Sequence, residues 1–179
     1  GITCTSSNAK AVIDWSWARR EKILFFPDEH LGRNTANKMG LAKEEMIVWD
    51  PFQPNGGNTR GAIQRAKLIL WKGHCSVHQM FQPVHVDNFR KQYPEGKVIV
   101  HPECHEDVVN KADLSGSTEF IIKTVTAAPA GTAWAVGTEL NLVNRLKRNL
   151  TDKKVFFLSS TVCQCATMFR IDGAHLCWA

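Results

Sequence analysis

The strongest constraint on the fold of this chain is a regular alternation of short apolar runs with longer segments of helical periodicity. The runs with strand character are 23–26, 46–49, 68–71, 97–100, 134–136 and 155–158, and helical spacing predicts helices over 9–20, 30–39, 84–93, 119–126 and 139–150. Strands that alternate with helices are typical of the α/β class, in which helices cover short parallel sheets. Ligands of such folds bind at the carboxyl ends of the strands.

An internal repeat divides the chain into two similar halves. An offset of 111 positions places residues 5–8 over 116–119 and residues 26–28 over 137–139. Each copy then has a Ser/Thr-rich turn that opens a helix, followed by a strand that ends in an acid opening another helix. Chance similarity between two α/β segments is the alternative. The stretch near 51–67, which begins with many Gly, Asn and Pro residues, is interpreted as an insertion in the first copy.

Composition favours an ordinary globular protein that keeps its thiols reduced. The hydrophobic content is 44%, and six cysteines in 179 residues are too few for a disulfide scaffold. We find neither a signal peptide nor an apolar run of about 18 residues or more, so we expect a cytoplasmic location and no membrane contact. Reduced thiols favour metal binding or catalysis.

The basic charges are scattered along the chain. The net charge is +5, but no nucleic-acid-binding motif accompanies the Lys and Arg residues. A solvated basic surface is the simpler interpretation, and we expect no nucleic-acid partner. A basic balance also suits small anionic substrates.

The two ends indicate an interior piece of a longer protein. The chain begins at Gly1 without an initiator Met. At the other end, Met168, Ile171, His175 and Trp178 repeat at helical spacing, which predicts that 166–179 is the start of a helix.

Three groups of residues could carry chemistry. The first is the pair of Ser/Thr turns, containing Ser6 in one copy and Ser117 with Thr118 in the other. Hydroxyl side chains at a helix start usually cap backbone N–H groups, and the same N–H groups can bind carboxylate or phosphate. Two equivalent turns make anion binding more plausible than either turn alone.

The second group is His101 and Glu103, directly after the run 97–100. Because they lie two residues apart at the extended end of a strand, their side chains should point to the same side of the chain. A His and a carboxylate in one pocket can transfer protons at neutral pH, although a surface ion pair is the simpler alternative.

The third group is the cysteines. Cys163 and Cys165 are too close together for a Cys-x2-Cys zinc motif, and Cys75 lies far upstream. A disulfide partner, a buried apolar residue, a zinc ligand and an iron–sulfur ligand all remain open for these residues.

Short motifs follow one another along nearly the whole chain, at 4–9 (CTSSNA), 26–28 (FPD), 31–33 (LGR), 71–78 (WKGHCSVH), 101–104 (HPEC), 116–118 (GST), 137–139 (GTE) and 165–168 (CATM). Taken together and in this order, they resemble the quinolinate synthase family, the iron–sulfur enzymes of NAD biosynthesis.

The resemblance implies three-layer αβα domains with short parallel sheets, arranged as three repeats about a pseudo-threefold axis. This chain would contain two of the three, with one domain over 1–75, one over 76–165, and the start of a C-terminal helix over 166–179. The first domain of the family would be missing.

The resemblance also implies a cofactor and roles for individual residues. Cys75 and Cys165 resemble two of the three cysteines that hold a [4Fe–4S] cluster, and the third would lie outside this chain. Cys163 is the alternative to Cys165, because it lies five residues before Met168 as Cys75 lies five before Met80. Cys4, Cys104 and Cys177 fall where the family uses no ligand.

For substrate binding, Ser6 resembles a carboxylate-binding residue, and Ser117 and Thr118 resemble an anion-binding turn. His101 and Glu103 resemble the polar pair beside the reacting carbons. We expect Glu103 to be the general base and His101 to orient a carbonyl or relay a proton.

The implied reaction is that of a transferase. It condenses iminoaspartate with dihydroxyacetone phosphate, with loss of phosphate and two waters, to give quinolinate. L-aspartate oxidase is a possible supplier of iminoaspartate. Two alternatives remain: a folded but inactive fragment of this enzyme, and a zinc- or thiol-dependent hydrolase built from Cys75, His78, His101 and Glu103.

Overall fold

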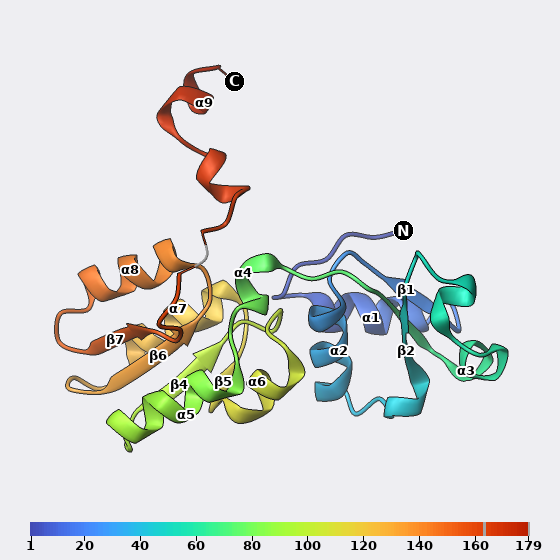
Figure 1. Cartoon of the computed structure of the whole chain (residues 1–179), viewed down its shortest axis with the longest axis horizontal. Coiled ribbons are helices and arrows are strands. Elements are labelled where there is room, and N and C mark those ends of the chain that lie inside the picture. Colours follow the sequence, from blue (N-terminus) through green and yellow to red (C-terminus); the bar gives the residue numbers. More distant parts are fainter. Residues whose placement is uncertain (163, 179) are drawn as a thin grey trace.

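The computed structural model describes residues 1–162 and 164–178, and it contains two short, entirely parallel sheets flanked by helices (Figure 1). The elements around the first sheet are α1 (Ala9–Trp17), β1 (Ile23–Phe25), α2 (Glu29–Lys38), the 3-10 helix η1 (Lys43–Glu45), β2 (Met46–Trp49), the 3-10 helix η2 (Pro54–Gly57), α3 (Arg60–Arg65) and β3 (Leu68–Trp71).

The second sheet and the helices around it follow along the chain. These elements are α4 (Ser76–Gln79), α5 (Pro83–Gln92), β4 (Lys97–Val100), α6 (Glu106–Lys111), β5 (Leu114–Ser115), α7 (Thr118–Ala127), β6 (Ala133–Gly137), α8 (Leu140–Asn149) and β7 (Lys154–Phe157). The 3-10 helix η3 (Met168–Arg170) and α9 (Gly173–Trp178) form an extension that points away from both sheets (Figure 1).

The strand orders are β1-β3-β2 and β5-β4-β6-β7, and every neighbouring pair is parallel. Alternate residues of β4 pack on opposite faces of the second sheet. Val98 and Val100 join the core beneath α5 and α6, whereas Ile99 joins the core beneath α7 and α8. The predicted α/β class with helices on both faces is thus confirmed.

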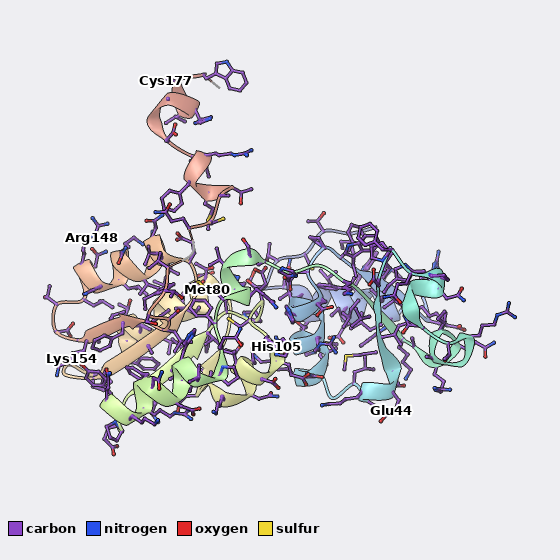
Figure 2. The ribbon with its side chains drawn as sticks, in the orientation of Figure 1. Glu44, Met80, His105, Arg148, Lys154 and Cys177 are labelled. Carbon is purple, nitrogen blue, oxygen red and sulfur yellow. The ribbon has the colours of Figure 1, made fainter. Side chains whose placement is uncertain are left out.

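Helix α2 connects the two sheets by packing against the segment that follows β4. Asn34 Nδ2 donates to the carbonyl oxygens of Pro102 and Cys104, both at 2.8 Å. Asn37 Nδ2 donates to Glu106 Oε1 at 2.9 Å. His105, labelled in Figure 2, lies at this junction and its ring centroid is 5.2 Å from that of His30 in α2. The loop that carries His101 and Glu103 is therefore anchored to α2.

The structure departs from the sequence expectation where elements are short. The two-residue strand β5 and the helices α3, α4 and α6, of four to six residues, were not predicted, because they are too short for their periodicity to repeat. Within 166–179, which the spacing predicts to be the start of a helix, the structure has the two short helices η3 and α9. Ile171 has φ −86° and ψ 80°, and it separates η3 from α9. The proposed domain limits at 75 and 165 stay predictions.

Among the described residues, the helices are too short or too polar for any of them to cross a bilayer.

Candidate functional site

The candidate site lies at the carboxyl ends of strands from both sheets. Cys75 follows β3, His101 follows β4, and Glu139 follows β6. A cavity of about 980 Å³ opens there, and its lining includes His78, His101, Glu103, Thr118, Glu139 and Met168. This is the position at which parallel α/β sheets bind their ligands.

Cys75, His78 and Glu103 form a group able to bind a metal ion. Cys75 precedes the short helix α4 and His78 lies one turn further along it, so both side chains project from the same side. Their ligand atoms and that of Glu103 all lie within 4.8 Å of one another. His78 Nδ1 is 3.0 Å from Glu103 Oε2, but the contact lacks the direction of a hydrogen bond, and this buried nitrogen has no hydrogen-bond partner among the described residues. A donor set of this kind, with His78 buried and Cys75 and Glu103 half-buried, fits a bound group.

His101 lies against the same group. Its ring stacks on that of His78 with centroids 4.6 Å apart, and its Nδ1 is 3.8 Å from Glu103 Oε2. Its Nε2 is within hydrogen-bond distance, 3.1 Å, of Ser6 Oγ. The expectation that His101 and Glu103 face one pocket is confirmed, while their chemical roles stay predictions.

The three ionisable side chains influence one another. Burial alone would lower the pKa of His78, but contacts with the Cys75 sulfur and the Glu103 carboxylate outweigh it and raise that pKa to about 9. Burial and the neighbouring His78 lower the pKa of His101 to about 4. Burial would raise the pKa of Glu103, yet the close contact with His78 and the charges of both histidines hold it below its usual value.

The two Ser/Thr turns differ in what their hydroxyl groups do. Ser117 Oγ accepts a hydrogen bond from the Phe120 N–H at 3.3 Å and caps α7, while Thr118 lines the cavity. Ser6 contacts His101 and borders a separate, smaller hollow. The N-cap of α1 is Asn8, whose side chain does not cap the helix. Anion binding by these turns stays a prediction.

The cysteines separate into distinct environments. Cys165 lies three residues before Met168, which lines the cavity, but it is not part of the Cys75 group. Hydrogen bonds with the Thr167 hydroxyl and from the Met168 N–H lower the pKa of its thiol. Cys104 is buried and Cys177 is exposed in the extension (Figure 2). Cys163, the alternative ligand, lies outside the described residues.

Sequence reasoning missed Asp28 and Thr138 and considered His78 only for a hydrolase. Asp28 is 8% exposed, and its carboxylate oxygens accept from the N–H groups of Leu31 (2.7 Å) and Cys75 (3.0 Å). Burial raises the pKa of Asp28 to about 6, despite these hydrogen bonds. Thr138 Oγ1 lies 3.3 Å from His78 Nε2. The triplets ending in Asp28 and Glu139 in the repeat were the available signal, because each of these residues follows a strand.

Gly73 allows the Cys75 segment to pack closely against Pro27, in the loop between β1 and α2. A Cβ atom at this position would lie 3.2 Å from the Trp71 side chain and would overlap the Pro27 carbonyl oxygen. We expect Gly73→Ala to lower the free energy of unfolding by about 1–3 kcal/mol, because the backbone must move to make room. Denaturant titration would measure it, with Gly173→Ala as the control, because no atom lies within 4 Å of that position. Equal stability of the two variants would contradict this interpretation.

The fold and site together define an α/β protein with a Cys–His–carboxylate group at the ends of its parallel strands. A family model described as "Quinolinate synthetase A protein" matches residues 1–179. The quinolinate synthase of Rhodopirellula baltica is 58% identical over 179 residues, which covers 99% of this chain and 46% of that protein. The corresponding protein of Nocardioides sp. is 54% identical over 186 residues, covering 100% and 47%, and that of Corynebacterium glutamicum is 49% identical over 179 residues, covering 100% and 45%.

The chain belongs to the quinolinate synthase family. It spans about half the length of the curated relatives that it matches.

Proposed function

We propose that the full-length protein containing this chain is a quinolinate synthase, which condenses iminoaspartate with dihydroxyacetone phosphate to form quinolinate. The family match over residues 1–179 carries this proposal. His78, His101 and Glu103 line one cavity, and the Cys75 sulfur lies within 4.8 Å of ligand atoms of His78 and Glu103. This arrangement supports the proposal, because these residues come from motifs on which the resemblance rests.

We propose that Cys75 and Cys165 would hold a [4Fe–4S] cluster together with a third cysteine outside this chain. Both are free thiols, and hydrogen bonds lower the pKa of the Cys165 thiol. When bound, the cluster supplies a Lewis acid for the dehydration steps.

The remaining steps fall to side chains of this chain. Glu103 Oε2 is held 3.0 Å from His78 and 3.8 Å from His101, so we assign it the proton abstraction. His101 would orient a carbonyl, with its ring fixed by His78 on one face and by Ser6 at Nε2. Ser6, Ser117 and Thr118 would bind the anionic groups of the substrates.

Activity of the full-length protein tests the proposal. Incubation with dihydroxyacetone phosphate and iminoaspartate, generated from oxaloacetate and ammonia, should yield quinolinate detectable by mass spectrometry. Absence of quinolinate from protein that carries its full iron and sulfide would refute it. We expect residues 1–179 alone to be inactive, because the third cluster cysteine is outside them.

A zinc-dependent hydrolase is the second candidate. The observation that favours it is the group of Cys75, His78 and Glu103, whose ligand types and mutual distances also suit a single Zn²⁺ ion. Stoichiometric zinc without sulfide in the purified protein would support this alternative.

We further propose a cytoplasmic location and L-aspartate oxidase as the supplier of iminoaspartate. Both proposals rest on the family resemblance.

A further inference from the structure

Two acidic residues occupy equivalent positions in the two copies of the repeat. Asp28 follows β1 and caps α2, and Glu139 follows β6 and caps α8. One carboxylate oxygen of each accepts the N–H three residues further on, from Leu31 at 2.7 Å and from Leu142 at 3.1 Å. Each of these oxygens thus makes the usual N-cap hydrogen bond of its helix.

The second oxygen of Asp28 holds the cysteine segment of its own copy. Asp28 Oδ2 accepts the Cys75 N–H at 3.0 Å. The same segment is tied to the start of α2 by a second bond, from the Glu29 N–H to the Gly73 carbonyl oxygen at 2.9 Å. Cys75 follows β3, the strand that pairs with β1. The acid thus fixes the backbone of a candidate ligand that lies 47 residues away.

The second oxygen of Glu139 is buried and has no hydrogen-bond partner among the described residues. A buried acceptor without a partner is costly, and in native proteins it usually has a reason. The segment carrying Cys165 follows β7, the strand that pairs with β6, so it is the counterpart of the Cys75 segment. Glu139 also lines the same cavity as Met168, which lies three residues after Cys165.

We propose that Asp28 and Glu139 are equivalent positioning residues, each capping a helix with one oxygen and holding the backbone of its own copy's cysteine segment with the other. In the cluster-loaded protein, Glu139 Oε1 accepts a backbone N–H from the segment that carries Cys165. The part concerning Glu139 rests on the proposed cluster, whereas the part concerning Asp28 does not. Hydrogen bonds of this kind commonly orient metal ligands.

Amide variants separate the two tasks of each acid. Asn or Gln retains one acceptor oxygen for the cap but presents an NH₂ group, which cannot accept from a backbone N–H. In the full-length protein without metal, Asp28→Asn should speed hydrogen exchange of the Cys75 amide about tenfold or more and leave the Leu31 amide protected. Unchanged exchange at Cys75, or equal loss at Leu31 and Cys75, would overturn the assignment.

Glu139→Gln tests the second half in the cluster-loaded, full-length protein. We expect iron to be lost to a chelator about 10- to 100-fold faster than from the unaltered protein. Peptides containing Cys165 should also exchange faster, while Leu142 stays protected. Glu139→Asp should restore both properties, because an aspartate performs this task in the first copy.

Asp172→Asn is the matched control, because Asp172 Oδ1 accepts the His175 N–H at the start of the exposed helix α9. It should leave both readouts unchanged. Iron retention and exchange in Glu139→Gln equal to the unaltered protein would overturn the proposal for Glu139. Failure of the unaltered protein to bind a cluster would instead refute both the proposed function and the role proposed for Glu139. The role proposed for Asp28 would still be decided by hydrogen exchange at the Cys75 amide.

Discussion

Glu103→Gln in the full-length protein is expected to lower quinolinate formation by about 10²- to 10⁴-fold, the range for loss of a general base. Glutamine retains the size of the side chain but cannot accept the proton. Bound iron and sulfide should remain, because Glu103 is assigned to the substrate and not to the cluster. Steady-state assay together with iron and sulfide analysis of the same preparation checks both parts.

The control for this variant is Asp107→Asn, which removes the same charge from an exposed side chain four residues away. It should leave turnover unchanged. Near-normal turnover of Glu103→Gln would contradict its assignment as the base. Loss of the bound metal from Glu103→Gln would instead favour the zinc alternative, in which Glu103 is a ligand.

Cys75→Ser should abolish cluster binding, and Cys165→Ser should do the same. A serine hydroxyl is a far poorer iron ligand than a thiolate, so the brown colour and visible absorption of the cluster should be lost after anaerobic reconstitution of the full-length protein. Cys163→Ser should retain the cluster. Cys177→Ser is the control for loss of a thiol, because Cys177 is exposed in the extension.

The outcome for the two neighbouring cysteines decides between them. Cluster loss from Cys163→Ser but not from Cys165→Ser would reverse the ligand assignment. Cys163, which lies five residues before Met168 as Cys75 lies five before Met80, would then be the ligand. Retention of the cluster in Cys75→Ser would contradict the whole ligand set.

The sequence was a good guide to those parts of the fold that are encoded locally. The strands β4 and β7 were predicted to within one residue, because apolar β-branched and aromatic residues are concentrated there. The starts of α2 and α8 were indicated by Asp28 and Glu139, acidic residues that follow a strand and cap the next helix. The break at Ile171 was not indicated, because helical spacing continues through this residue although its backbone leaves the helical conformation.

The site was predictable only where its residues are adjacent in sequence. His101 and Glu103 follow one strand, so their common orientation could be anticipated. The contact of Thr138 with His78 joins residues 60 positions apart, and the Asp28 contact with Cys75 depends on the pairing of β1 with β3. Nothing in local periodicity specifies that pairing, because both strands are short apolar runs.

The central claim is that this chain forms part of an iron–sulfur quinolinate synthase. Elemental and sulfide analysis of the anaerobically purified full-length protein tests it most directly. We predict about four iron and four sulfide ions per chain, as a [4Fe–4S] cluster requires, and no zinc. One zinc ion per chain without sulfide would contradict the account.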